Sequence, residues 1–159
     1  MMASTEHLQV SIVAFEERYA RAFAELNYEW LRKYFVIEPI DRKILEHPHQ
    51  YIMEPGGEIL MAIVDGAPVG TVALIKTGPQ EYELAKMAVT EQYKGLRIGQ
   101  KLMYACIDTA RQLGCNRLWL DSNSSLTPAL SLYTKVGFKH IERPKSKYAR
   151  GDVRMELFL

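Results

Sequence analysis

Four closely spaced residues have the types and spacing that bind phosphate: Lys94, Gly95, Arg97 and Gly99. The glycines let the backbone approach phosphate oxygens, and the lysine and arginine add full positive charges. If a helix begins here, the N–H groups of its first turn and its dipole add a partial positive charge of about half a unit. The turn therefore predicts an anion site, although a plain strand-to-helix connection with a solvated basic turn explains the same residues.

The segments around this turn have the patterns of a strand and a helix. Residues 82–89 are dense in apolar side chains, as in a largely buried strand. Ile98, Leu102 and Cys106 recur at the spacing of one helix face. Downstream, residues 117–121 form a second short apolar run, which predicts another strand.

A second motif follows on a predicted helix that has Pro128 in its first turn. It consists of Ala129, the pair Leu132–Tyr133 and the pair Gly137–Phe138. With both motifs, the chain resembles the GNAT superfamily of acetyl-CoA-dependent N-acetyltransferases. The resemblance covers residues 58–138 and is weaker on either side.

The resemblance implies a mixed α/β fold, with a mostly antiparallel twisted sheet and helices on both faces. It also implies a pair of parallel strands that splay apart, so that the pantetheine arm of the cofactor enters between them. Those strands would end near Val89 and Asp121. We expect residues 1–159 to form a single domain.

Acetyl-CoA is the co-substrate that the resemblance implies. Backbone groups of the strand before the turn would pair with the pantetheine amides and stabilise the oxyanion, and the turn would hold the pyrophosphate. Asn123 would replace the family asparagine that touches the pantetheine arm, because Leu126 stands in its place. The expected cofactor-binding set is Met87, Ala88, Val89, Lys94, Gly95, Leu96, Arg97, Ile98, Gly99, Gln100 and Asn123.

The turn departs from the family pattern at Arg97, where similar proteins have their central glycine. Either the backbone at this position still curls around the pyrophosphate, or Gly95 supplies the flexibility and the Arg97 guanidinium reaches a phosphate. Lys94 stands where the family has Gln or Arg, which is a mild change because lysine remains a cation.

Two side chains would carry the acetyl transfer if the resemblance holds. Tyr133 would donate a proton to the departing sulfur, and Glu83, eleven residues before Lys94, would take a proton from the amine, directly or through a water. The alternatives are a packing role for Tyr133 and a solvated or Lys86-paired Glu83. We expect no covalent intermediate and no metal.

Hydrophobic periodicity and turn residues predict the other elements. Pro48 should end a short helix, and Asp65–Gly66 is a hairpin signal. The expected strands are 7–13, 58–64, 68–76, 81–89, 117–121, 138–142 and 153–158, and the expected helices are 16–34, 41–46, 97–113 and 127–137.

Composition narrows the possible partners. Lys and Arg number 20 against 19 for Asp and Glu, so no basic field predicts a nucleic-acid partner. Cys106 and Cys115 lack CxxC spacing, which predicts reduced thiols in a cytoplasmic protein. The first residues have no long apolar run, so we expect no membrane association. His47–Pro48–His49 lacks further ligands and is expected to be loop surface.

The acceptor site has weaker sequence signals. Tyr28, Trp30, Tyr34 and Phe35 end the first predicted helix, which often walls the acceptor pocket in similar folds, although core packing explains the same spacing. Residues 148–152 form a polar turn that is a candidate to overhang this site. Acceptor pockets are built from variable loops, so the acceptor itself cannot be identified from these residues.

We therefore expect an N-acetyltransferase that moves the acetyl group of acetyl-CoA to a primary amine of a small metabolite or peptide. The transfer would be a direct attack in a ternary complex, and the resemblance allows a homodimer. Two alternatives stay open. One is an acyl-CoA-binding regulatory domain with weak catalysis, and the other is a protein-interaction domain that binds no coenzyme A.

Overall fold

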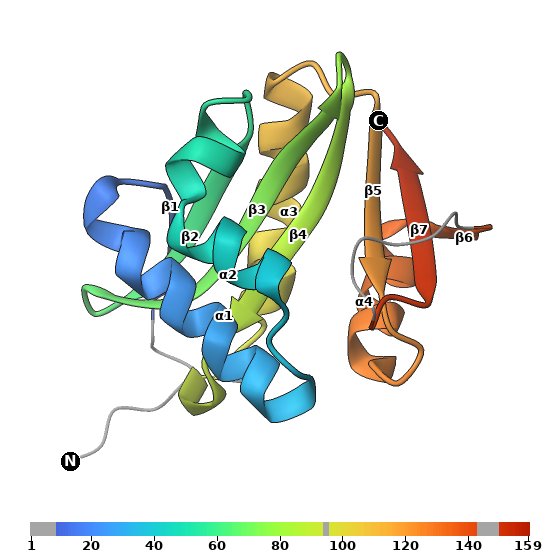
Figure 1. Cartoon of the computed structure of the whole chain (residues 1–159). Coiled ribbons are helices and arrows are strands. Elements are labelled where there is room, and N and C mark those ends of the chain that lie inside the picture. The colour runs from blue at the N-terminus through green and yellow to red at the C-terminus, as the bar shows by residue number, and fades with distance from the viewer. Residues whose placement is uncertain (1–8, 94–95, 143–149) are drawn as a thin grey trace.

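The computed structural model describes residues 9–93, 96–142 and 150–159. Within these residues, seven strands form one sheet in the order β1-β2-β3-β4-β5-β7-β6 (Figure 1). Only the β4–β5 pair is parallel among the strand pairs of the described chain, so the sheet is mostly antiparallel. The strands are β1 Ser11–Ala14, β2 Glu58–Val64, β3 Ala67–Gly78, β4 Glu81–Val89, β5 Arg117–Ser122, β6 Lys139–Ile141 and β7 Val153–Phe158.

Helices cover both faces of the sheet (Figure 1). Side chains of β2 alternate between the faces: Leu60 and Ala62 belong to the core under α3, whereas Ile59 and Met61 pack with α1 and α2. This alternation confirms the predicted mixed α/β fold. The α-helices are α1 Ala20–Tyr34, α2 Pro39–Glu46, α3 Ile98–Gln112 and α4 Thr127–Val136.

The parallel strands splay apart, as predicted. β4 and β5 pair only over Glu81–Arg117, Tyr82–Leu118 and Glu83–Trp119. Beyond Glu83, β4 continues alongside β3, and β5 continues alongside β7. Figure 1 shows the two strands diverging.

A β-bulge interrupts β4 inside the splayed region. Thr71 of β3 pairs with Ala88 and Ala73 pairs with Ala85, so one β3 residue lies opposite Lys86 and Met87. Lys86 has a φ of 55°, in the left-handed region. The bulge changes the direction of the strand where it leaves β5.

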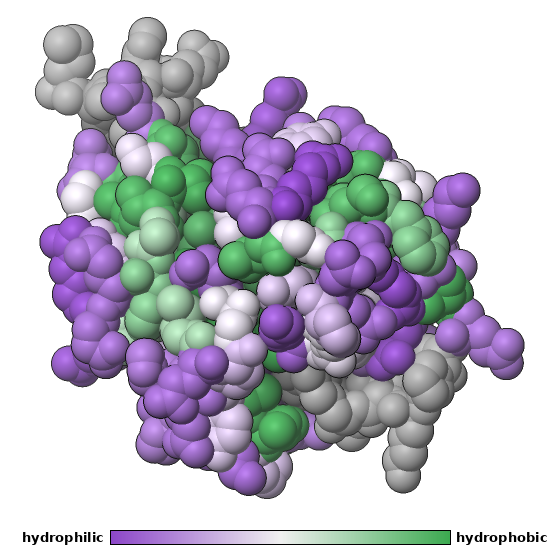
Figure 2. Space-filling view, turned by 90° about the horizontal axis from the view of Figure 1, so that it is seen from above, coloured by the Kyte–Doolittle hydropathy of each residue, from purple (hydrophilic) through white to green (hydrophobic). Residues whose placement is uncertain are grey.

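The surface seen from above Figure 1 is mixed in character. Hydrophilic side chains cover most of this view, and hydrophobic ones gather in several separate patches (Figure 2). The described chain contains no helix long and apolar enough to cross a membrane.

Some boundaries differ from the sequence predictions. β1 begins at Ser11, whereas the predicted strand spanned 7–13 and its first residues lie outside the described ones. The first helix was predicted from residue 16, but a 3₁₀ turn at Glu17–Tyr19 precedes α1. α2 begins at Pro39, before the predicted residue 41, because Glu38 and Asp41 form a capping box and proline suits the first helical position.

Two short helical segments were not predicted at all. A π-helix spans His49–Met53, where we expected loop surface around His47 and His49. A 3₁₀ turn spans Glu91–Tyr93, between β4 and the basic turn. Both are single turns, which are too short to produce a periodic hydrophobic pattern in the sequence.

Candidate active site

A cavity of about 650 Å³ lies where β4 and β5 separate. Its walls come from α1, β4, the end of β5, the start of α4 and the loop before β7. Carbonyl and amide groups of a splayed strand have lost one neighbouring strand, so they are able to pair with an extended ligand. The cavity therefore combines a large volume with a backbone edge.

Both predicted catalytic side chains line this cavity. Glu83 belongs to the last β4–β5 pair, at the point of divergence, and is only 1% exposed. Tyr133 comes from α4, on another wall. The fold thus brings together two groups that lie 50 residues apart in the sequence.

The Tyr133 phenol is a protonated group with its hydroxyl available. Burial raises the pKa of Tyr133 to about 12, so the phenol keeps its proton at neutral pH. Within residues 9–93, 96–142 and 150–159, its hydroxyl has no hydrogen-bond partner. The ring lies 6.1 Å from Phe138, centroid to centroid, in a tilted arrangement. A protonated phenol without a partner, on a residue that lines a cavity, is suited to donate a hydrogen bond or a proton to a ligand.

Three of the predicted cofactor residues, Met87, Ala88 and Val89, line the cavity along β4. Ala88 and Val89 pair with β3 on one side, and the β5 ladder has already ended at Glu83. The opposite edge of this segment therefore faces the cavity and not a strand. This arrangement is the one that pantetheine amides would need.

The basic turn is only partly described, because the predicted Lys94 and Gly95 lie outside the described residues. Arg97 has φ 58° and ψ 26° as the N-cap of α3. This left-handed conformation favours glycine, so the backbone keeps the bend that the family glycine would provide despite the arginine side chain. Gly99 lines the cavity, and a Cβ there would meet no atom within 4 Å.

Other predicted turn residues take different places. Ile98 is buried at 2% exposure, and Leu96 packs against the same core. Their side chains hold α3 on the sheet, which leaves only their backbone groups for a ligand. Arg97 and Gln100 are outside the cavity lining.

Asn123 lines the cavity, but its amide is already bonded on both sides. Its Nδ2 donates to the Arg150 carbonyl at 2.6 Å, and its Oδ1 accepts from the Ser125 backbone N–H at 2.8 Å. The Ser125 hydroxyl donates to the same oxygen at 2.6 Å. These bonds join the end of β5 to the loop before β7.

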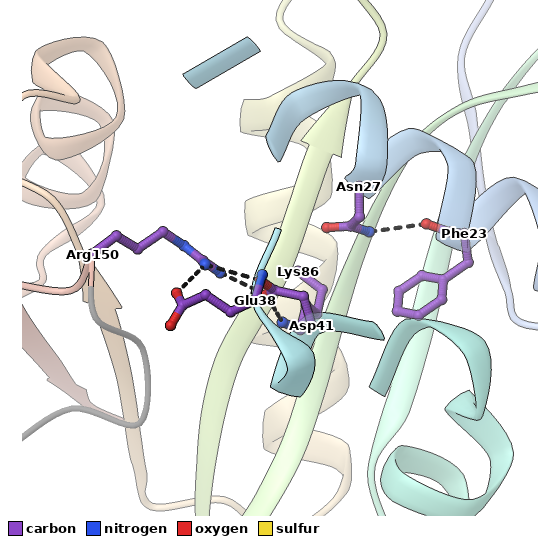
Figure 3. Close-up of polar contacts among 6 residues, drawn as sticks. All are labelled: Phe23, Asn27, Glu38, Asp41, Lys86 and Arg150. Atoms are coloured by element: carbon purple, nitrogen blue, oxygen red, sulfur yellow. Dashed lines mark hydrogen bonds and ion pairs between the residues drawn. The ribbon is translucent and has the colours of Figure 1, made fainter. Parts of the chain in front are cut away.

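An ion cluster that the sequence did not reveal lies beside the cavity (Figure 3). Arg150 donates from Nη2 to Asp41 Oδ1 at 2.8 Å and from Nη1 to Glu38 Oε2 at 2.8 Å. Lys86 Nζ lies 3.3 Å from the same Asp41 Oδ1. Of the predicted turn 148–152, residues 148 and 149 lie outside the described residues, and Arg150 and Gly151 line the cavity. The other members lie far from it in the sequence, and only the fold brings them together.

The cluster is deeply buried at its centre. The Asp41 side chain is 0% exposed and the Lys86 side chain 5% exposed. Burial alone would raise the pKa of Asp41, but hydrogen bonds from Arg150 and the Glu38 backbone, with the charge of Lys86, lower it below its ordinary value. Asp41 is therefore an anion at neutral pH that links α2, β4 and the loop before β7.

One face of α1 forms the remaining wall. Asn27, Trp30, Leu31 and Tyr34 recur at helical spacing and all line the cavity. The Trp30 ring lies 5.7 Å from that of Tyr34, and Phe35 also lines the cavity. Of the predicted aromatic set, Tyr28 lies outside the cavity lining and donates from its hydroxyl to Glu46 at 3.0 Å.

Other candidate groups have structural surroundings. Cys106 is fully buried in the core, where burial raises the pKa of its thiol, so it is a packing residue. His49 Nε2 lies 3.6 Å from Glu54 Oε1 on the surface. The part of the chain that the structure describes contains no group of three or more His, Cys, Asp or Glu side chains placed to hold a metal ion.

Comparisons with known proteins agree with this geometry. The family model described as "Acetyltransferase (GNAT) family" matches residues 22–138, so the chain belongs to this family. This membership confirms the predicted family. Among curated proteins, the chain is similar to the Xenopus tropicalis protein named "Probable N-acetyltransferase camello", with 35% identity over 100 residues. That alignment covers 62% of this chain and 46% of the relative.

Solved structures establish the fold. A GNAT-family acetyltransferase from Staphylococcus aureus Mu50 has a TM-score of 0.84 and 24% identity, covering 93% of this chain and 98% of that one. A Bacillus subtilis acetyltransferase in complex with CoA has a TM-score of 0.72 and 24% identity, covering 95% and 99%. The chain spans about half of the length of the curated relatives that it matches first.

Proposed function

We propose that this chain transfers the acetyl group of acetyl-CoA to a primary amine by direct attack in a ternary complex. The observation that carries the proposal is that Glu83 and Tyr133 line the same cavity from different walls, beside the unpaired edge of β4. Membership of the acetyltransferase family supports the same reaction.

Each group has a chemical task in this proposal. The lone pair of the neutral amine attacks the thioester carbonyl carbon, and Glu83 takes the N–H proton that this nitrogen loses, directly or through a water. Backbone N–H groups of residues 87–89 stabilise the oxyanion and pair with the pantetheine amides. When the C–S bond breaks, Tyr133 donates its proton to the departing sulfur. The transfer needs neither a covalent enzyme intermediate nor a metal.

The cofactor phosphates would bind at the N-terminus of α3. The first backbone N–H groups of this 15-residue helix have no partner within the helix, and the glycine at 99 leaves open space beside its Cα. Lys94 and the Arg97 guanidinium would add positive charge. Asn123 would contribute through the loop that it holds.

Other predictions from the sequence stay predictions. They are a single domain over residues 1–159, a cytoplasmic location and a homodimer. We propose no nucleic-acid or membrane partner, because the net charge is only +1 and no segment of the sequence calls for either.

The first experiment is a thermal shift with acetyl-CoA, with adenosine 3′,5′-bisphosphate and desulfo-CoA as comparators. At about a hundredfold excess over the dissociation constant, linkage adds about 2.7 kcal/mol, which raises the melting temperature by several degrees. Release of free thiol with an amine panel then measures turnover. Binding without turnover would favour the regulatory-domain alternative, and no shift with millimolar ligand would leave the protein-interaction alternative.

A further inference from the structure

Asn27 has a buried polar atom that no group of the described residues satisfies. The residue is 3% exposed on the cavity face of α1. Its Nδ2 donates to the Phe23 carbonyl at 3.0 Å, and this bond fixes which end of the amide is the oxygen. The side-chain oxygen accepts no hydrogen bond from the described residues.

The orientation of this oxygen points to a ligand. In Figure 3 it lies on the side of the amide away from Phe23, toward β4 and the Asp41 cluster. A buried carbonyl oxygen without a partner is costly, so native structures nearly always supply a donor. Here the cavity is where that donor would come from, and an amine is a hydrogen-bond donor.

The surface next to Asn27 is aromatic. Trp30 and Tyr34 lie on the same helix face, three and seven residues further along, and Phe35 follows. The Trp30 ring contacts both of the others, at centroid distances of 5.7 and 5.5 Å. Tyr34 stays 39% exposed, so this wall is not simply closed core. Planar apolar groups stack well on such a surface.

Among the charged side chains that line the cavity, Asp41, Lys86, Asp121 and Arg150 form ion pairs. Asp41 binds Lys86 and Arg150, and Asp121 binds Arg154 through two bonds of 2.8 and 3.0 Å. Among the described residues, three acidic side chains of the lining stand against Lys86 and Arg150, with Arg154 paired to one of them. This part of the site has no block of like charge that would select an acceptor with several charges.

We propose that the acceptor is a primary amine attached to an aromatic group, with its N–H bound by Asn27 Oδ1 and its ring on Trp30 and Tyr34. This inference rests on the proposed acetyl transfer. It assigns Asn27 as an acceptor-binding residue and the aromatic wall as the determinant of acceptor choice.

The test compares steady-state acetylation of phenethylamine, butylamine and spermidine by the full chain at saturating acetyl-CoA. The kcat/KM for phenethylamine should exceed that for butylamine by about tenfold or more, because one ring face is desolvated on the aromatic wall. Spermidine should be the poorest acceptor. Equal values for phenethylamine and butylamine, or a preference for spermidine, would overturn the inference.

Variants then separate the two contributions. Asn27→Leu should raise the KM for phenethylamine about tenfold or more while leaving the acetyl-CoA thermal shift unchanged. Asn27→Asp keeps an acceptor oxygen and should hold the KM within about threefold of the wild type. Trp30→Ala should remove most of the preference for phenethylamine over butylamine. The control is Asn116→Ala, an exposed amide that bonds only Gln80 Oε1 among the described side chains, which should change none of these values.

The outcomes also distinguish this inference from the proposed function. If acetyl-CoA fails to bind, the proposed function fails and the inference falls with it. If acetyl-CoA binds and other amines are acetylated but phenethylamine is not preferred, or if Asn27→Leu leaves the KM unchanged, the acceptor assignment alone is wrong. If Asn27→Leu does not fold, the wild-type selectivity and Trp30→Ala still decide the question.

Discussion

The Arg150 guanidinium donates hydrogen bonds from two nitrogens to the Asp41 carboxylate, at 2.8 and 3.1 Å, although 109 residues separate the two residues in the sequence. Asp41 lies in the first turn of α2 and Arg150 in the loop before β7, so this contact joins two sides of the cavity. Lys86 reaches the same carboxylate from the bulge in β4. This side of the cavity is therefore held by one buried anion and two cations.

Replacing this anion should cost considerable stability. Asp41→Asn would leave Lys86 and Arg150 partly uncompensated in a buried place, and we expect a loss of about 3–5 kcal/mol in the free energy of unfolding. Urea denaturation at neutral pH measures it. Asp65→Asn, at an exposed position in the turn between β2 and β3, is the matched control and should change little.

The same residue predicts a pH dependence. The pKa of Asp41 is lowered in the folded protein. Its contribution to the free energy of unfolding is therefore complete above its unfolded pKa of about 3.9, and it is lost as pH falls through its folded pKa. The stability gap between the wild type and Asp41→Asn should therefore narrow below about pH 4. A gap that stays constant down to about pH 2 would contradict this account.

Tyr133→Phe should reduce catalysis without weakening cofactor binding. The variant removes only the hydroxyl, so we expect kcat to fall about 10- to 100-fold, with the KM for acetyl-CoA within a few-fold of the wild type. Because the pKa of Tyr133 is raised to about 12, its ionisation should cause no loss of rate below about pH 10. Tyr104→Phe, on an exposed part of α3, is the control. An unchanged kcat would assign Tyr133 to packing alone.

Glu83→Gln tests the base in the same way. The amide keeps the size of the side chain and cannot take the proton, so kcat should fall about 10²-fold or more. Glu81→Gln, two residues earlier and bonded to Arg117 at 2.8 Å, lies outside the cavity lining and should keep the wild-type rate. The rate of free-thiol release by each variant, measured under the same conditions, gives the comparison of kcat. If the two variants lose the same activity, Glu83 has no special part in the reaction.

Arg97 allows charge and backbone strain to be separated. Arg97→Ala removes the charge but keeps a side chain at a left-handed position. Arg97→Gly removes the charge and also the strain of a side chain at that position. The free energy of unfolding of Arg97→Gly should equal that of Arg97→Ala or exceed it by up to about 1 kcal/mol, because φ at this position is 58°. Both should weaken acetyl-CoA binding about 3- to 10-fold at low salt, and less at high salt. A glycine variant clearly less stable than the alanine variant would argue against strain at this position.

The sequence by itself determined most of the fold. The apolar run of β4, the basic turn and the periodicity of α3 predicted a strand, an anion site and a helix, and the motif around Tyr133 identified the family before any coordinates. These features are local: a period of two or of 3.6 residues and a turn glycine are legible over a short window. Glu83 and Tyr133 were also predicted this way, Tyr133 from its motif and Glu83 from its offset of eleven residues before Lys94.

The tertiary structure alone decided how the acceptor end is built. Asp41, Lys86 and Arg150 lie on three different elements, and no spacing rule links them. The bend at Arg97 was likewise open, because an arginine rarely takes a left-handed φ unless its surroundings impose it. Whether the Asn27 side-chain oxygen has a hydrogen-bond donor depends on where the neighbouring elements lie, which the sequence does not specify. Local patterns fix elements, but a site made of contacts between distant segments depends on how those elements pack.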